Sequence, residues 1–179
     1  MVIELKVIMI SGKAESGKNF VADVMRRKLE DDGNKVLTVA FGDYVKFLCG
    51  TYFGWDGKKD EKGRYLLQHI GTGVFRQYDE DFFANRVVDL IKATGGLDYV
   101  IIPDLRFENE LHIIHSNFDA VAIRVERSGF ENSLTATQKL NQSETELDNH
   151  PGFDYTINTN DAAEKEKQAL MILEEIVNG

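Results

Sequence analysis

Cysteine is almost absent from this chain of 179 residues, in which Cys49 is the single example. One cysteine excludes a disulfide framework and a cysteine-based metal site. Cys49 lies in an apolar pattern typical of a helix, so we interpret it as a buried and inert thiol. The 4 histidines have no spacing that indicates a zinc site. No apolar run reaches the length of a transmembrane helix.

Basic residues are in the minority, with 21 Lys and Arg against 30 Asp and Glu and a formal net charge of −9. Nucleic acids and membrane surfaces are bound by basic faces, so we expect neither as a partner. Glu4 and Lys6 interrupt the first apolar run and no small-residue cleavage site follows, which argues against a signal peptide and for a cytoplasmic protein. The length and the 42% of apolar residues predict one globular domain, residues 1–179.

What the chain does contain is a glycine-bounded loop between a strand pattern and a helix pattern. The apolar run Leu5–Ile10 predicts a buried strand, and Phe20–Leu29 has apolar residues at helical spacing. Glycines let backbone N–H groups turn toward an anion, and the start of a helix adds partial positive charge. Lys18 would reach the outer phosphates of a nucleotide. The alternative is a turn that binds nothing, but the strand–loop–helix context favours a phosphate loop. The predicted nucleotide-binding residues are Gly12, Lys13, Ala14, Glu15, Ser16, Gly17, Lys18, Asn19 and Phe20.

Two residues are candidates for the magnesium side of such a site. Asn19 stands where phosphate loops usually have a Ser or Thr whose hydroxyl binds the metal, and an amide oxygen is a weaker partner. Asp104 ends the apolar strand Tyr99–Ile102, where a second carboxylate on the magnesium side belongs. The alternative for Asp104 is a cap for the helix after it. We predict that Asp104 and Asn19 lie by Mg²⁺.

Strand patterns alternate with helix patterns along the whole chain, which predicts an α/β fold with a mostly parallel, five-stranded sheet and helices on both faces. The predicted strands are Leu5–Ile10, Lys35–Phe41, Tyr99–Ile102, Ala120–Val125 and Phe153–Ile157. The predicted helices are Phe20–Leu29, Tyr44–Phe53, Arg64–Tyr78, Asp81–Thr94, Glu108–Ser116 and Asp161–Val177, the last capped by Thr159 or Asn160. Ligands of such sheets bind at the carboxyl ends of the strands.

Arginines gather at those predicted strand ends and on the helices beside them. Arg106, Arg124 and Arg127 follow strands, and Arg64 and Arg76 lie between the second and third strands. Guanidinium groups bind two phosphate oxygens at once, so this cluster favours a phosphate-bearing ligand. The helical residues Arg26, Arg27 and Arg86 are interpreted as surface charges. Residues 127–148 lack a periodic apolar face, which favours a lid over a plain surface loop.

Several stretches resemble the deoxynucleoside monophosphate kinases of bacteriophages and bacteria. They are Ser11–Ala22, Leu66–Thr72 and Ile102–Glu110, together with Gln142-Ser143-Glu144 and Leu147-Asp148 in the segment after the lid. The resemblance implies a three-layer, adenylate-kinase-like P-loop fold that moves the ATP γ-phosphoryl group to a (deoxy)nucleoside 5′-monophosphate with Mg²⁺. An acceptor that is itself a phosphate needs no strong general base, so catalysis is mostly alignment and charge neutralisation.

The resemblance also implies roles for individual residues. Lys18 and the loop hold ATP, Arg106 meets the acceptor phosphate, and Asp43 and Lys46 match a substrate-side stretch. Members commonly have Asp where this chain has Asn19. The lid holds only Arg127 and Lys139 as basic residues, so the transition-state cation stays unassigned. The candidate catalytic residues are Lys18, Arg106 and Arg127. The candidate substrate-binding residues, mostly in an acceptor-binding helical region at about 43–95, are Asp43, Lys46, Arg64, Gln68, Arg76 and Arg106.

A second resemblance, to animal-type phosphomevalonate kinase, is carried by the phosphate loop and by residues 143–149. That acceptor has a carboxylate and no base, so its site would need one more cation and no aromatic stacking. A group of aromatic residues near the acceptor region favours a nucleobase instead. These are Trp55, Tyr65, Phe75, Phe82 and Phe83. A non-catalytic nucleotide-binding protein is the third reading, although no guanine-reading Asn-Lys-x-Asp segment is present. The base and sugar of the acceptor stay open, as does a homodimer.

Overall fold

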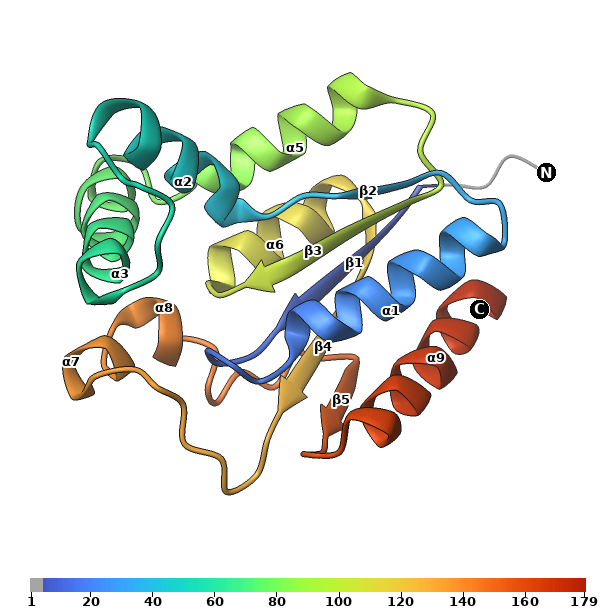
Figure 1. The fold of residues 1–179 in the computed structure, drawn as a ribbon. Helices are drawn as coiled ribbons and strands as arrows, with labels where there is room; N and C mark the ends of the chain where they lie inside the picture. The colour runs from blue at the N-terminus through green and yellow to red at the C-terminus, as the bar shows by residue number, and fades with distance from the viewer. Residues whose placement is uncertain (1–4) are drawn as a thin grey trace.

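The computed structural model describes residues 5–179, so Glu4, used above against a signal peptide, lies outside the described part. Its centre is a parallel sheet of five strands in the order β2-β3-β1-β4-β5 (Figure 1). The strands are β1 (Lys6–Ser11), β2 (Val36–Thr38), β3 (Tyr99–Leu105), β4 (Asp119–Glu126) and β5 (Tyr155–Asn158). The predicted α/β class and five-stranded parallel sheet are confirmed.

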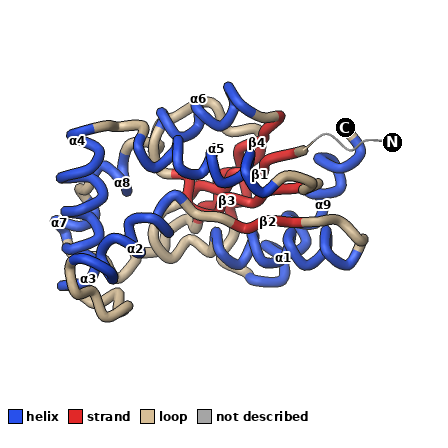
Figure 2. Tube along the Cα trace, turned by 90° about the horizontal axis from the view of Figure 1, so that it is seen from above, coloured by secondary structure: helices blue, strands red, loops and turns tan. Residues whose placement is uncertain are grey.

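Helices cover both faces of this sheet and extend beyond one end of it (Figure 2). They are α1 (Lys18–Asp31), α2 (Phe41–Tyr52), α3 (Glu61–Gln68), the π-helix η1 (His69–Phe75), α4 (Arg76–Tyr78), α5 (Phe82–Thr94), α6 (Glu108–Asn117), α7 (Ala136–Lys139), α8 (Gln142–Thr145) and α9 (Ala162–Asn178). Apolar residues of α1 and α9 pack on one face of the sheet, and those of α5 and α6 pack on the other. These layers confirm the predicted three-layer arrangement.

A smaller apolar cluster lies at the carboxyl ends of the strands and holds α2, η1 and α5 together. Its buried members include Val45, Cys49, Ile70 and Phe83. Burial raises the pKa of the Cys49 thiol, which agrees with its interpretation as an inert group. This cluster fixes the helical region that closes one side of the site described below.

Several boundaries differ from the predictions because residues far away in the sequence set them. The second strand, predicted as Lys35–Phe41, covers only Val36–Thr38 (β2). Helix α2 begins at Phe41 instead of Tyr44. The predicted helix Arg64–Tyr78 is three consecutive segments, α3, η1 and α4. Residues 127–148 contain two short helices, α7 and α8.

The start of α9 also differs from the prediction. Asp161 caps this helix, not Thr159 or Asn160, and its carboxylate accepts a hydrogen bond of 2.8 Å from the Glu164 N–H. Across residues 5–179, no helix is both long enough and apolar enough to span a bilayer.

Candidate active site

The glycine-bounded loop joins the end of β1 to the start of α1. Gly12 has φ +157°, and a Cβ there would lie 2.5 Å from both the Ser16 Oγ and the Val125 carbonyl oxygen. No side chain fits, so the loop closes tightly between two strand ends. The buried Ser16 Oγ has no hydrogen-bond partner among residues 5–179. A buried polar atom without a partner fits a loop that receives a polar ligand.

Lys18 opens α1 and is buried, with its Nζ donating to the Lys13 carbonyl oxygen at 3.1 Å. Burial and, after it, the nearby charge of Arg106 lower the pKa of Lys18 to about 8, against the opposing effect of Glu144 and Asp104. A lysine in this state gains its full charge when an anion arrives. Lys18 is therefore a buried cation at the start of α1, beside the loop.

A single cavity of about 780 Å³ connects this loop to the helical region at the strand ends. It brings together most of the residues predicted from the sequence. Those that line it are Ala14, Glu15, Gly17, Lys18, Asn19, Asp43, Lys46, Arg64, Gln68, Arg76, Asp104 and Arg106. Gly12, Lys13, Ser16 and Phe20 belong to the loop but do not line the cavity.

Sequence reasoning missed other residues of the cavity wall. Lys59 was given no role from the sequence, and Arg26 was interpreted as a surface charge, yet both line the cavity. Burial is the main cause of a lowered pKa of Lys59, and neighbouring positive charges lower this pKa as well. Lys59 follows Lys58 in the sequence, and no periodic pattern marks one of the two as facing a ligand.

Asp104 holds the start of α2. Its two carboxylate oxygens accept hydrogen bonds of 2.9 Å from the N–H groups of Phe41 and Gly42. Asp104 does not cap the following helix: the N-cap residue of α6 is Phe107, and Glu110 in the first turn accepts from the Arg106 and Phe107 N–H groups. Asp104 therefore places the N-terminal end of α2 at the cavity wall.

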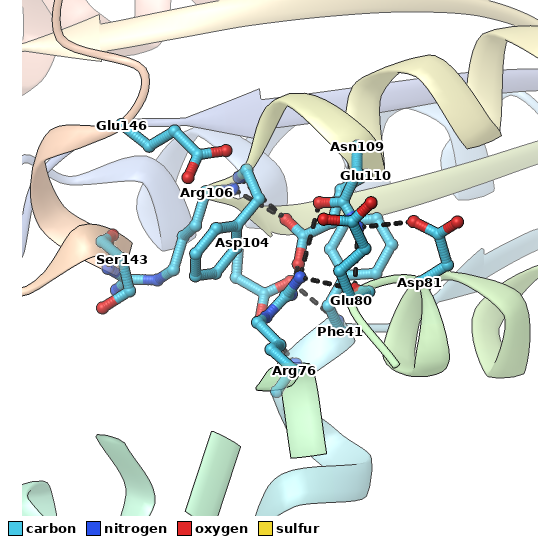
Figure 3. A network of polar contacts seen from close by, with 12 residues as sticks. Phe41, Arg76, Glu80, Asp81, Asp104, Arg106, Asn109, Glu110, Ser143 and Glu146 are labelled. Atoms are coloured by element: carbon cyan, nitrogen blue, oxygen red, sulfur yellow. Dashed lines mark hydrogen bonds and ion pairs between the residues drawn. The ribbon is translucent and has the colours of Figure 1, made fainter. Parts of the chain in front are cut away.

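Arg76 reaches the cavity from α4 and is fixed by several contacts, which include hydrogen bonds to the Glu80 carbonyl oxygen and to Asn109 (Figure 3). Its guanidinium group pairs with the buried Glu110 and lies 3.6 Å from the centroid of the Phe107 ring. Burial raises the pKa of Glu110 to about 7, although the charge of Arg76 opposes this shift. The adjacent Asn109 amide donates to Asp81 at 2.8 Å. Residues 104–110, which have the pattern Asp-x-Arg-Phe-x-Asn-Glu, thus contribute to a network of polar contacts that joins α4, α5 and α6.

Arg106 is held by the segment that was predicted to be a lid. Its guanidinium group pairs with Glu144 and donates to the Ser143 carbonyl oxygen at 2.8 Å (Figure 3). The Glu144 carboxylate also accepts a hydrogen bond of 3.0 Å from the Ala14 N–H in the phosphate loop. Sequence reasoning gave Glu144 no role. It now links the loop, the end of β3 and α8.

Two arginines of the predicted cluster lie elsewhere. Arg127 does not line the cavity; it donates to the Glu15 carbonyl oxygen at 3.2 Å and its guanidinium lies 3.6 Å from the Phe130 ring centroid. Its prediction as a catalytic cation has no geometric support in this arrangement. Arg124 is buried and donates to the Ser11 Oγ and to Asp148. Both arginines thus form hydrogen bonds that hold the phosphate loop or the strand end before it, from outside the cavity.

The aromatic residues expected to cover a nucleobase are mostly elsewhere. Of the five, Phe83 alone lines the cavity, while the Trp55 Nε1 donates to the Lys58 carbonyl oxygen at 2.8 Å. Phe41 and Phe107 supply the other aromatic parts of the wall. Most of the five pack within the helical region instead, so the group supports a nucleobase pocket less than its place in the sequence indicated.

The residues present fit a magnesium ion that arrives with a phosphate ligand. Asp104 and Asn19 both line the cavity beside Lys18 and offer the oxygen atoms that Mg²⁺ prefers. Within residues 5–179 no group of three or more His, Cys, Asp or Glu side chains could hold a metal alone. Phosphate oxygens and waters would complete the coordination, as is usual for this ion.

No family model and no curated protein matches this chain. Among solved structures, the APS kinase of Mycobacterium tuberculosis in complex with AMPPNP and APS has a TM-score of 0.58 at 12% identity, covering 96% of this chain and 98% of that chain. The shikimate kinase of Aquifex aeolicus has a TM-score of 0.55 at 15% identity, covering 97% and 99%. The fold of this chain is therefore that of the P-loop kinases.

Proposed function

We propose that this protein is an ATP-dependent kinase that transfers the γ-phosphoryl group to the phosphate of a (deoxy)nucleoside 5′-monophosphate. One observation carries the proposal: a single cavity runs from the phosphate loop to a wall rich in fixed cations. These cations are Lys18, Arg26, Lys46, Lys59, Arg64, Arg76 and Arg106. Six carboxylates also line the cavity, and four of them pair with these cations, so the cations are held in position for a ligand with several phosphates.

The residues divide the work between donor and acceptor. The loop amides and Lys18 would bind the outer phosphates of ATP, and Arg76 and Arg106 would orient the acceptor phosphate with paired donors. Arg76 is fixed by the buried Glu110, so it loses little conformational entropy when the acceptor binds. Mg²⁺, held with the phosphates beside Asp104 and Asn19, would neutralise charge on the transferred group. An ionised acceptor oxygen needs no general base.

A phosphorylated carboxylic acid of the phosphomevalonate type is the second candidate acceptor. It is favoured by the number of cations in the wall and by the small share of the predicted aromatic residues that face the cavity. A nucleobase is still accommodated by the volume and by the faces of Phe41, Phe83 and Phe107. The two acceptors differ in charge and in stacking surface, so turnover separates them.

The test is ADP release from ATP and Mg²⁺ with a panel of deoxynucleoside and ribonucleoside monophosphates and phosphomevalonate. We expect turnover with at least one nucleotide, and a loss of about 100-fold or more in kcat/KM in Lys18→Ala, because that variant lacks the cation at the loop. Lys28→Ala, on the exposed end of the same helix, is the matched control and should leave turnover unchanged.

Each result assigns a different function. Turnover with phosphomevalonate alone would replace the nucleotide by the second candidate. ATP binding without turnover of any acceptor would favour a non-catalytic nucleotide-binding protein. Full activity in Lys18→Ala would contradict the assignment of the phosphate loop.

A further inference from the structure

Helix α9 places a lysine directly against the phosphate loop. Lys165 is 5% exposed, and its Nζ donates a hydrogen bond of 2.8 Å to the Ser16 carbonyl oxygen. A Cβ on Gly17 would lie 2.7 Å from that Nζ and 3.3 Å from the Lys165 Cδ. Gly17 also has φ +96°, a backbone conformation that favours glycine, and the Lys165 side chain occupies the space beside it.

The charge of Lys165 is not balanced by the protein. Among residues 5–179, no carboxylate lies within 4 Å of its Nζ. Burial lowers the pKa of Lys165, and the charge of Arg127 adds to this effect. An unpaired buried ammonium group costs folding free energy unless an anion supplies the missing charge.

Three cations hold carbonyl groups of the loop. Lys18 donates to the Lys13 carbonyl oxygen, Arg127 to that of Glu15 and Lys165 to that of Ser16. Arg127 and Lys165 do not line the cavity. A carbonyl that is bound outside the cavity keeps the neighbouring N–H groups free for a ligand inside it.

We propose that Lys165 is a positioning residue of the nucleotide site: it fixes the Ser16 carbonyl and supplies positive charge behind the phosphates. The inference rests on the proposed function, because it requires that the loop binds a polyphosphate. The ligand chemistry is the triphosphate itself, independent of the base. Lys165 contacts the loop and not the reacting atoms, so it acts on binding and not on the chemical step.

Two substitutions separate charge from hydrogen bonding. Lys165→Gln keeps a donor for the Ser16 carbonyl but has no charge, and Lys165→Met has neither. The probes are ATP and inorganic tripolyphosphate, with affinities measured by isothermal titration calorimetry and unfolding midpoints measured without ligand. Lys167→Met is the matched control, since Lys167 is exposed on the same helix.

In both Lys165 variants we expect Kd for ATP and for tripolyphosphate to rise about 10-fold or more, the range of a lost charge-assisted contact. The KM for ATP should rise together with the Kd, while kcat at saturating ATP changes less than about 2-fold. The reason is that the lost contact stabilises the bound ATP equally in the ground state and in the transition state. Without ligand, the unfolding midpoint of Lys165→Met should equal or exceed that of the wild-type protein, since the variant lacks the buried charge. A purely structural lysine would give a lower midpoint.

The failures are distinguishable. Wild-type protein that binds neither probe would overturn the proposed function and this inference together. Wild-type binding with unchanged affinity in both variants would overturn the inference alone. Normal affinity in Lys165→Gln with weak binding in Lys165→Met would overturn the role of charge. If Lys165→Met does not fold, Lys165→Gln against Lys167→Met still decides between these outcomes.

Discussion

At the scale of the residue, the protonation of Lys18 is coupled to its ligand. Its pKa in the free protein is about 8, while an unfolded lysine titrates near 10.5. Between these values the unfolded chain binds the proton and the folded chain does not, so this group makes the unfolding free energy increase as pH rises from about 8 to about 10.5. Phosphate oxygens beside the ammonium group would restore its charge and raise this pKa again.

ATP binding at pH 8 should therefore take up about half a proton, because about half of the Lys18 population is neutral there. The uptake is measured by calorimetry in buffers of different ionisation enthalpy, with Mg²⁺ present. It should vanish at pH 6, where Lys18 is already charged, and should be absent in Lys18→Met. Binding enthalpies that do not depend on the buffer at pH 8 would contradict the placement of Lys18 on the phosphates.

At the scale of the element, local signals were sufficient for β1, the phosphate loop and α1, because strand, glycines and helix pattern follow each other directly. Contacts far apart in the sequence were not visible. The α2 helix begins at Phe41 because Asp104, 63 residues away, accepts its N–H. The helical pattern of residues 61–78 did not show that this stretch is three segments, of which the middle one buries Ile70 in the cluster at the strand ends.

Contacts between residues far apart in the sequence also limit how much of the site can be predicted from the sequence. Residue types predicted Lys18, Arg76 and Arg106 at the cavity, since strand ends and their flanking helices converge there. The partner of Arg106, Glu144, lies 38 residues away and belongs to a segment without periodicity. Arg127 follows a strand just as Arg106 does, yet it contacts the Glu15 carbonyl outside the cavity. Position at a strand end does not determine the direction of a side chain.

The Asp104 cap gives a prediction for α2. Asp104→Ala leaves the Phe41 and Gly42 N–H groups without their acceptor, so the unfolding free energy should fall by about 1–2 kcal/mol. Asp104→Asn, which keeps one oxygen acceptor, should lose less. Urea denaturation measures both, with Asp89→Asn as a control on the exposed face of α5, where the loss should stay below about 0.5 kcal/mol. Equal stability of Asp104→Ala and wild type would remove the capping role.

At the scale of the whole molecule, residues 127–148 are fastened to the phosphate loop at three successive positions. Lys13 pairs with Asp148 at 2.8 Å, the Ala14 N–H donates to Glu144, and the Glu15 carboxylate accepts from Ser133. Two of these contacts place a carboxylate on Lys13 and on the Ala14 N–H, both in the predicted phosphate loop. The cavity of this acidic chain therefore holds cations whose charge is partly neutralised by neighbouring carboxylates.

Glu144 is the member of this set that competes most directly with a nucleotide, since it occupies both a loop N–H and the guanidinium group of Arg106. Replacing it by Gln removes a negative charge beside the phosphates, so Glu144→Gln should bind ATP about 5- to 10-fold more tightly. The same change leaves Arg106 without its counter-charge, so the unfolding free energy without ligand should fall by about 1–2 kcal/mol.

Calorimetry with ATP and urea denaturation measure these two opposite effects on one variant. Glu146→Gln is the matched control: Glu146 accepts from the Glu108 N–H and does not touch the loop, so its loss should leave ATP affinity unchanged. Weaker ATP binding in Glu144→Gln would show that the carboxylate organises the loop for its ligand. Tighter binding with lower stability would show that the ligand-free protein uses Glu144 in place of a phosphate, and that residues 127–148 must release the loop when ATP binds.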